Sequence, residues 1–415
     1  MQFIADFHIH SKYSRATSRD MDLENLDKWA RIKGIKVLGT GDFTHFDWFK
    51  NLKEKLEPAE PGLFKLKKGD GGTRFILTAE ISCIYSKNGK VRKIHILIFA
   101  PSFEIVEKIN VQLGWIGNLR ADGRPILGLD AKELTKIVLN ISQDCLVVCS
   151  HAWTPWFSVF GSRSGFDSLE ECFDEYTKYI FAIETGLSSD PAMNWRLSAL
   201  DKITLISNSD SHSPSKIGRE ANVFDTELSF AAIADAIKQK NPQKFLYTIE
   251  FFPEEGKYHY DGHRLCNIVL SPQESKKYNN ICPNCGKPLT IGVLNRVDAL
   301  ADREEGFKPQ GAIPFKSLIP LAEIIADALG VLSGAKQVEK EYENLIEKFG
   351  NEFKILLGAS RQDLESATSP EIAEGIERVR EGKVFIEPGY DGVYGKVRIF
   401  SKGEKANLSK QKTLF

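Results

Sequence analysis

The chain has 415 residues, of which 42% are hydrophobic and 27% charged, and its net charge at pH 7 is −1. This length predicts two or three domains with an ample core. The near-neutral balance excludes a uniformly basic surface, so any contact with nucleic acid must come from local basic patches. No apolar run reaches membrane-spanning length and no signal-peptide pattern opens the chain, which predicts a cytoplasmic protein with no membrane partner.

The first predicted strand, residues 3–7, ends in two histidines, His8 and His10. Residues two apart on a strand point to the same face, so both imidazoles can reach one metal ion. Further imidazoles and carboxylates lie beside other strand-like segments: Asp42, His45, Glu80, His95, His151, Asp210 and His212.

Strand-like and helical segments alternate over the first 250 residues. Helices are expected at 23–34 and 130–141, and strands at 37–40, 74–82, 93–100, 146–148, 180–185 and 203–207. Such alternation predicts parallel strands. Each candidate group would then lie at the carboxyl end of a strand, where α/β barrels keep their chemistry.

These nine imidazoles and carboxylates are more than one ion requires, so they predict two or three ions. Glu80 has two oxygens and is the natural bridge between two of them. The mixture of donors suits zinc, manganese or iron better than magnesium alone. The alternative is that each histidine is an ordinary core or surface residue, but that explanation would have to hold for every one of them.

A second candidate metal site follows residue 252. His263 and Cys266 form one pair at x2 spacing, and Cys282 and Cys285 form another. Two such pairs predict knuckles around one tetrahedral structural zinc, with a small ribbon between them. His259 is the rival for the histidine position, and incidental thiols are the alternative to a zinc site.

The last hundred residues are expected to be mostly helical, with helices at 318–329, 338–349 and 371–381 and a closing pair of strands within 384–399. The predicted domains are therefore a catalytic barrel (1–253), a zinc-binding module (254–298), a mainly helical domain (299–403) and a flexible tail (404–415). In the tail, Gln411, Leu414 and Phe415 are similar to part of a sliding-clamp-binding peptide.

The motifs around the candidate ligands resemble those of the PHP superfamily, which takes its name from polymerase and histidinol phosphatase. The matching runs are Asp6-Phe7-His8-Ile9-His10-Ser11, Gly41-Asp42, Glu80, His95, Ser150-His151 and Asn208-Ser209-Asp210-Ser211-His212. The resemblance implies an α/β fold, a distorted (β/α)7 barrel with a trinuclear site for phosphoester hydrolysis. Phe43 stands where the superfamily usually has a histidine, so we expect His45 to substitute there.

More narrowly, the whole chain resembles the endonuclease Q family. The most specific matches are the run from Ser150 to Ser162, the cysteine and histidine knuckles, and the segment from Leu289 to Val297. The resemblance implies a DNA repair endonuclease that cleaves on the 5′ side of uracil, hypoxanthine, xanthine and abasic sites in single- or double-stranded DNA. It implies a catalytic set of Asp42, Glu80, His151 and Asp210, with zinc expected at this site and manganese or magnesium as alternatives.

Loop 153–166 directly follows His151 and is the candidate for a lesion pocket or wedge. Its aromatic side chains would stack on a flipped base, worth about 1–3 kcal/mol per base, and its polar side chains would form hydrogen bonds. Lys67 and Lys68, in a polar insert at 51–72, are candidate phosphate contacts or simply solvated. The predicted DNA contacts are Trp153, Trp156, Phe157, Phe160, Ser162, Arg163, Lys67 and Lys68.

Two other functions compete with the endonuclease hypothesis. One is a small-molecule phosphatase of the histidinol-phosphate type, which would not need the zinc module and the helical extension. The other is a non-catalytic DNA-binding protein or clamp adaptor, which would not need the nearly complete set of metal ligands.

Overall fold

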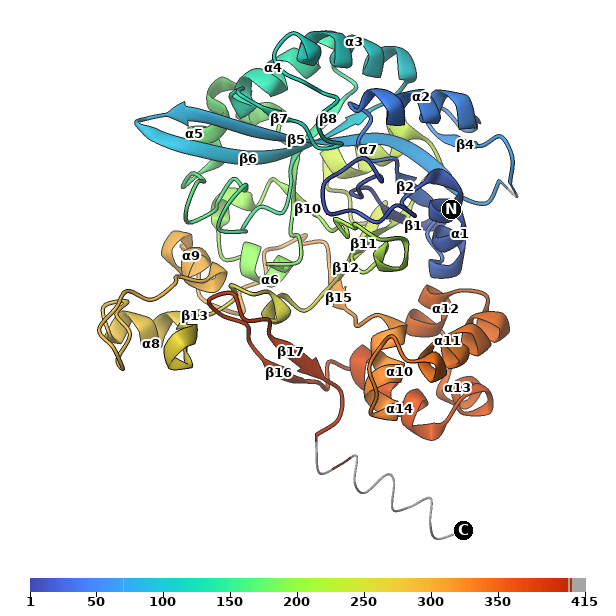
Figure 1. Cartoon of the computed structure of the whole chain (residues 1–415), viewed down its shortest axis with the longest axis vertical. Helices are drawn as coiled ribbons and strands as arrows, with labels where there is room; N and C mark the ends of the chain where they lie inside the picture. Colours follow the sequence, from blue (N-terminus) through green and yellow to red (C-terminus); the bar gives the residue numbers. More distant parts are fainter. Residues whose placement is uncertain (70, 402–403, 405–415) are drawn as a thin grey trace.

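The computed structural model describes residues 1–69, 71–401 and 404 (Figure 1). Its largest part is a curled sheet in the order β10-β9-β8-β6-β5-β2-β1-β11-β12-β15. The strands of this path are β1 (Gln2–Asp6), β2 (Val37–Gly39), β5 (Arg74–Lys87), β6 (Lys90–Ala100), β8 (Leu146–Cys149), β9 (Ala182–Glu184), β10 (Thr204–Ile206), β11 (Ala221–Asp225), β12 (Phe245–Glu250) and β15 (Phe315–Ser317).

The sheet curls far enough for the chain beyond β10 to meet the chain beyond β1. Ile9 and Ser211 form a parallel bridge there, and the His10 amide donates a hydrogen bond to the Ser211 carbonyl at 2.9 Å. This contact brings the His8–His10 segment beside Asp210. The predicted α/β class is confirmed, whereas the count of seven β/α units stays a prediction.

The strands do not all run in parallel as predicted. β5 and β6 form an antiparallel hairpin, and β8 runs antiparallel to β6. The turn consists of Asn88 and Gly89, both with positive φ (54° and 71°), which is the backbone that a two-residue hairpin turn requires. Glu80 and His95 consequently lie inside long strands rather than at strand ends, which corrects their expected placement.

Helices cover the outside of the sheet. They are α1 (Leu23–Lys33), α2 (Phe46–Lys55), α3 (Phe103–Gly114), α4 (Ala131–Ile141) and α7 (Phe230–Gln239), with short α5 (Leu169–Phe173) and α6 (Pro191–Asn194). The predicted helix at 23–34 has the expected caps, because the Asp22 side chain accepts from the Asn25 amide and Gly34 ends the helix with φ 91°.

The insert at 51–72 is more ordered than its polar composition indicated. It contains the last turns of α2 and a small hairpin of β3 (Leu56–Pro58) and β4 (Phe64–Leu66), and β4 pairs with β5. A further short strand, β7 (Ile126–Leu127), runs parallel to β5.

The candidate zinc module lies beside α6, below the sheet (Figure 1). It contains β13 (Asp261–His263), β14 (Ile268–Leu270), α8 (Pro272–Lys277) and α9 (Val293–Leu300). The segment between the two knuckles contains strand β14 and helix α8, and the small ribbon expected there stays a prediction.

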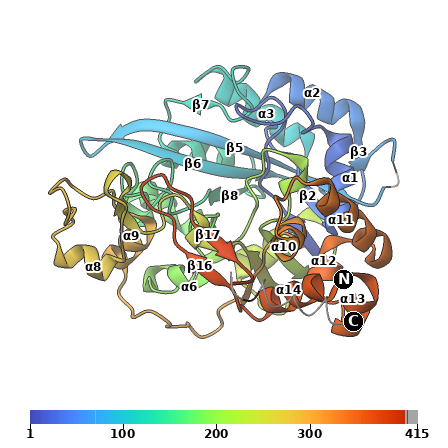
Figure 2. The same ribbon diagram turned by 60° about the horizontal axis from the view of Figure 1, so that its bottom comes forward.

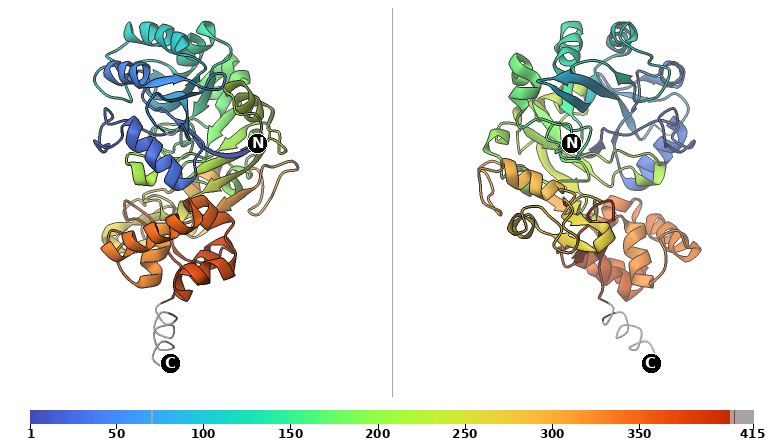
Figure 3. Two further views of the ribbon diagram at one scale, coloured as in Figure 1. Left: turned by 90° about the vertical axis from the view of Figure 1, so that its right-hand side faces the viewer. Right: turned by 60° about the vertical axis from the view of Figure 1, so that its left-hand side comes forward.

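The C-terminal part is a bundle of five helices below the sheet (Figure 3). They are α10 (Leu321–Leu329), α11 (Lys336–Phe349), α12 (Glu352–Leu357), α13 (Arg361–Ala367) and α14 (Pro370–Arg380). A buried ion pair, Lys33 Nζ to Glu352 Oε2 at 2.6 Å, joins α12 to α1 of the barrel.

The closing strands, β16 (Phe385–Glu387) and β17 (Lys396–Arg398), lie between the bundle and the zinc module (Figure 2). Their loop returns to the module, where the Tyr260 amide donates to the Gly389 carbonyl. Among the described residues, no helix combines the length and apolar character needed to cross a bilayer. The predicted clamp-binding residues Gln411, Leu414 and Phe415 lie outside the described part of the chain.

Candidate metal centre and DNA-binding loop

Six of the predicted ligands converge at the mouth of the curled sheet. His8, His10, Glu80 and Asp210 form one group of potential ligand atoms, all within 4.8 Å of one another. Glu80, His95 and His151 form a second group within the same limit. The chain beyond β1 supplies the first two histidines, and the β5–β6 hairpin supplies Glu80 and His95.

Glu80 belongs to both groups and uses its two oxygens differently. Its Oε1 lies 3.0 Å from His95 Nδ1, 3.2 Å from His151 Nε2 and 3.6 Å from His8 Nε2. Its Oε2 lies 3.4 Å from His10 Nε2. This arrangement is the one expected of a carboxylate that bridges two ions.

The donor set fits divalent metal ions on two grounds. Four buried atoms that point into the first group, His8 Nε2, His10 Nε2, Glu80 Oε1 and Asp210 Oδ1, form no hydrogen bond despite their proximity. Burial raises the pKa of Glu80, but the charges of His95, His8 and Arg124 outweigh this effect and hold its pKa well below the usual value. A buried carboxylate surrounded by imidazoles is typical of a cation-binding site and not of a hydrophobic core.

Three residues of the site region have positive φ although none is glycine. The values are 28° for His151, 45° for Asp210 and 50° for Asp42. Such backbone costs on the order of 1–3 kcal/mol per residue and is retained mostly where function needs a particular side-chain direction.

Glu184, at the end of β9, supports the centre and was missed in the sequence. Its carboxylate lies 2.9 Å from His8 Nδ1, accepts from the His151 amide at 3.0 Å and accepts from Asn208 Nδ2 at 2.8 Å. These contacts orient His8 with Nε2 toward the site, which is how carboxylates support metal-bound histidines. The strand-end position of Glu184 was the available signal.

Asp42 has a supporting role rather than the expected position as a direct ligand. Its Oδ1 lies 3.0 Å from His10 Nδ1. Its Oδ2 accepts from the Ser11 amide and from the hydroxyls of Ser11 and Ser14 at 2.6–2.8 Å. Both oxygens are therefore used to orient His10 and its loop.

The remaining two histidines do not complete a third group of ligands among the described residues. His45 precedes α2 and its ring stacks on Tyr13 at 4.5 Å, outside both groups. His212 is closer, with Nε2 3.7 Å from Asp210 Oδ1 and Nδ1 2.7 Å from Thr17 Oγ1. The proposed substitution of His45 for the missing family histidine is not supported by this geometry.

Arg124, on the loop before β7, is the second residue missed in the sequence. Its Nη1 donates to Glu80 Oε2 at 3.0 Å, and its side chain is only 28% exposed. A guanidinium therefore lies at the rim of the candidate metal centre, where it offsets the charge of the Glu80 carboxylate.

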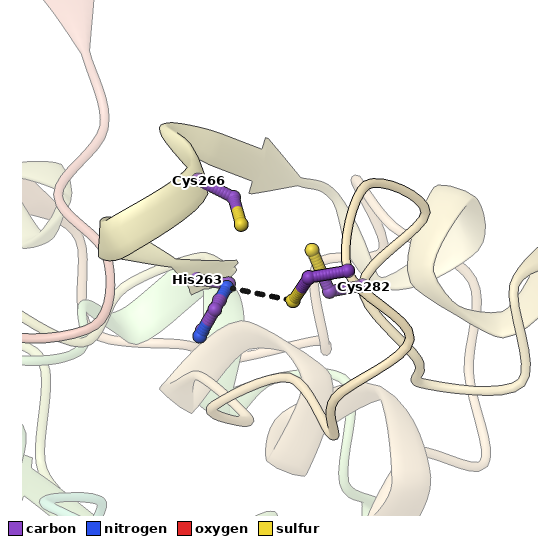
Figure 4. A group of neighbouring side chains, drawn as sticks. His263, Cys266 and Cys282 are labelled. Atoms are coloured by element: carbon purple, nitrogen blue, oxygen red, sulfur yellow. Dashed lines mark hydrogen bonds between the residues drawn. The ribbon is translucent and has the colours of Figure 1, made fainter.

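The four candidate ligands of the structural zinc also lie together. His263, Cys266, Cys282 and Cys285 have ligand atoms within 4.8 Å of one another. Figure 4 shows His263, Cys266 and Cys282 turned toward a common point, and His263 Nδ1 lies 3.5 Å from Cys285 Sγ. Burial raises the pKa of Cys282, but the backbone amides of Cys285 and Asn284 bring it down to about 7, which favours the thiolate. His259 lies outside this group, so the structure favours His263.

Loop 153–166 divides into a buried part and an exposed part. Trp153 and Phe160 are 1% and 2% exposed and pack on each other, so they belong to the core and present no surface to a base. This corrects two of the predicted lesion contacts. The Phe157 ring contacts the His95 ring at a tilt, with ring centres 4.7 Å apart, whereas Trp156 is 41% exposed, and Ser162 and Arg163 are exposed.

Lys67, one of the predicted phosphate contacts, is occupied elsewhere. Its ammonium donates to the carbonyls of Lys53 and Glu54 at the carboxyl end of α2, where a cation is favoured. Lys68 is exposed, and its role as a phosphate contact stays a prediction.

Comparison with known proteins begins with the helical bundle, where residues 320–383 match the family model described as the MJ0043 C-terminal domain. The uncharacterized protein MJ0043 of Methanocaldococcus jannaschii is 34% identical over 309 residues, which are 70% of this chain. The chain spans only 37% of the length of that relative.

Two solved structures match over nearly the full chain. The lesion-specific endonuclease PfuEndoQ from Pyrococcus furiosus is 32% identical, with a TM-score of 0.87 and complete coverage of both chains. An endonuclease Q in complex with a 27-mer duplex substrate, with an abasic lesion at the active site, is 32% identical at a TM-score of 0.85, with 97% of this chain and 98% of that chain covered.

The curled α/β sheet and the ligand groups at its mouth are those of a metal-dependent endonuclease. This class is indicated jointly by the fold, which matches from end to end, and by two groups of side chains that could hold metal ions. The chain belongs to the endonuclease Q family.

Proposed function

We propose that the protein is a DNA repair endonuclease that cleaves the phosphodiester on the 5′ side of deaminated bases and abasic sites. The observation that carries this proposal is the convergence of five imidazoles and carboxylates around Glu80, in a chain that matches lesion-specific endonuclease Q over its full length. The matching complex with lesion-containing duplex supports damaged DNA as the partner.

Two groups of residues would hold metal ions. His8, His10, Glu80 and Asp210 would hold one, and Glu80, His95 and His151 would hold the other. When bound, divalent ions supply Lewis acidity that activates water and polarises the phosphodiester. Zinc is the proposed ion, with manganese or magnesium as alternatives.

The other residues of the site orient these ligands and balance charge. Glu184 and Asp42 fix the ring orientation of His8 and His10 through the ring nitrogen that faces away from the ion site. Arg124 places a fixed positive charge beside Glu80, where an anionic phosphate would approach. We infer that the guanidinium contacts the substrate phosphate and offsets charge that develops on it during cleavage.

The zinc module and the helical bundle extend the surface available to DNA. Because the whole chain is near neutral and Lys67 is occupied, we infer that these two modules supply further contacts to DNA. We propose a cytoplasmic location for this activity. Clamp binding through the C-terminal residues stays a prediction.

The test is cleavage of a 5′-labelled duplex that contains one deoxyuridine, one deoxyinosine or one abasic site, with manganese or zinc added. We expect a single nick immediately 5′ to the lesion, with a 3′-hydroxyl and a 5′-phosphate at the break, and no nick in the undamaged duplex. Phosphate release from histidinol phosphate without nicking would favour the phosphatase, and retardation in a gel without nicking would favour the adaptor.

A further inference from the structure

The β5–β6 hairpin extends beyond its neighbour β8 in the sheet (Figure 1). β8 pairs with residues 96–99 of β6, so residues 90–95 reach past the end of β8. Loop 153–166 lies beside this part of the strand, and the His95 amide donates to the Phe157 carbonyl at 3.0 Å. Because His95 is one of the candidate ligands, the projecting part of the hairpin forms a wall beside the candidate metal centre.

Lys93 lies on this wall, on the same side as His95. Residues two apart on a strand point to the same face and are about 6.6 Å apart along it. Ser164 holds the Lys93 backbone in place, because its carbonyl accepts from the Lys93 amide and its hydroxyl donates to the Lys93 carbonyl, both at 3.3 Å. The hairpin register pairs Lys93 with Ile84 of β5. Lys93 is therefore fixed just outside the two groups of candidate ligands.

Phe157 positions the Lys93 side chain. The ammonium lies 5.4 Å from the centre of the Phe157 ring, and that ring contacts the His95 ring with centres 4.7 Å apart. Attraction between a cation and an aromatic ring extends to about 6 Å. Phe157 has φ 64°, a backbone conformation that is costly for an aromatic residue and is retained mostly at functional sites. The side chains thus follow one another in the order Lys93, Phe157, His95 toward the candidate metal centre.

The ammonium of Lys93 is available for an anion. In the part of the chain that the structure describes, no carboxylate forms an ion pair with it and no group accepts a hydrogen bond from it. Lys87, nearer the tip of the same hairpin, is instead paired with Asp174 at 3.0 Å. Lys93 is only half-exposed, so its charge lies close to the protein surface beside the metal centre. The substrate of the proposed endonuclease is a chain of phosphodiesters, so the anion that fits is a phosphate.

We propose that Lys93 binds a phosphate next to the scissile one and thereby fixes the register of the DNA strand on the metal centre. The inference rests on the proposed endonuclease function and adds a substrate-binding residue to it. The scissile phosphate would meet the ions and Arg124, whereas Lys93 lies two residues farther along β6 than the ligand His95. A small displacement of the reacting group lowers the rate of cleavage strongly, so Lys93 should affect the rate as well as the affinity.

Single-turnover nicking and affinity are measured with an abasic duplex for the wild type, Lys93→Met and Lys93→Arg. Lys93→Met removes the charge, and we expect nicking to fall about tenfold or more, which is the effect of one charge-assisted hydrogen bond. Lys93→Arg keeps the charge and should stay within about threefold of the wild type. Lys90→Met is the matched control, because Lys90 is exposed on the other face of the same strand, and it should change nicking less than about twofold.

The contact itself is tested by neutralising single phosphates. Two further abasic duplexes each carry one uncharged methylphosphonate, at the phosphate on one or the other side of the scissile one. At the contacted position, wild-type nicking should fall about tenfold and Lys93→Met should lose no more, because both changes remove the same interaction.

An equal loss from Lys93→Met on the normal duplex and on both methylphosphonate duplexes would overturn the inference. Wild-type nicking by Lys93→Met would overturn it as well. Failure of the wild type to nick the unmodified abasic duplex would instead count against the proposed function.

Discussion

Glu80 lies inside strand β5, opposite Leu97 of β6, and the hairpin register places His95 diagonally across from it on the same face. The histidines of the His-x-His pair were predictable because their spacing on a strand fixes their common direction. The contacts of Glu184 and Arg124 were not predictable, because Glu184 supports His8 across 176 positions and Arg124 reaches Glu80 across 44. The spacing of residues in the sequence does not predict which ring nitrogen of a histidine a distant carboxylate will contact.

At this scale we predict that Arg124→Met lowers the turnover of nicking more than it lowers DNA affinity. The lost interaction is a charge-assisted hydrogen bond, worth about 1.5–3 kcal/mol or roughly 10- to 100-fold in rate. Arg124→Lys should recover part of the loss, since it keeps the charge without the planar fork. Single-turnover rates and binding isotherms measured side by side check this. A loss confined to affinity would contradict a role at the reacting phosphate.

At the scale of elements, the helices at 23–34 and 130–141 were predictable because apolar spacing and capping residues agree there. The prediction of parallel strands was wrong for β5 and β6, although Asn88-Gly89 is a strong hairpin signal in the sequence. Where the sheet curls on itself, the Ile9–Ser211 bridge joins segments about two hundred residues apart. No local pattern encodes such a contact.

Two buried acids should make the stability of the barrel depend on pH. They are Glu220, directly before β11, and Glu250, at the end of β12. Burial raises the pKa of Glu250 to about 7, from a usual value near 4.5, and also raises that of its neighbour Glu220. The folded protein therefore holds protons that the unfolded chain has released, so the free energy of unfolding should fall as pH rises from about 4.5 to 7.

Glu250→Gln should reduce this fall by up to about 1.4 kcal/mol per pH unit, the contribution of one proton. Denaturant unfolding of wild type and variant at several pH values between 5 and 8 measures it. Exposed Glu227→Gln is the control and should leave the slope unchanged. Parallel wild-type and Glu250→Gln curves would contradict the assignment.

At the scale of the whole molecule, the division into a barrel, a zinc module and a helical bundle stays a prediction. The predicted boundaries treat these parts as separate, but the structure interleaves them. β15 joins the barrel sheet, and the loop of the β16–β17 hairpin returns to the zinc module, where the Thr290 hydroxyl bonds to Asp391. Composition shifts mark where a module begins, but they do not reveal which later strand returns to it.

From this arrangement we expect the zinc module to contribute to the stability and the DNA binding of the whole protein. Cys282→Ser should remove one tightly bound zinc per chain and lower the melting temperature, and it should weaken binding to lesion-containing duplex because the module extends the surface available to DNA. Lys287→Ala, an exposed neighbour in the same knuckle, should do neither. Metal analysis and thermal melting of both variants test this prediction. An unchanged zinc content in Cys282→Ser would exclude a zinc site at His263, Cys266, Cys282 and Cys285.

The central claim is that residues scattered over two hundred positions form one hydrolytic metal centre. Asp210→Asn tests it most directly, because it removes a charged ligand while keeping the shape of the side chain, with exposed Asp225→Asn as the control. We predict that Asp210→Asn abolishes nicking of an abasic duplex while its affinity for that duplex stays within a few-fold of wild type. Full nicking activity in Asp210→Asn, or parallel loss of nicking and binding, would contradict the account.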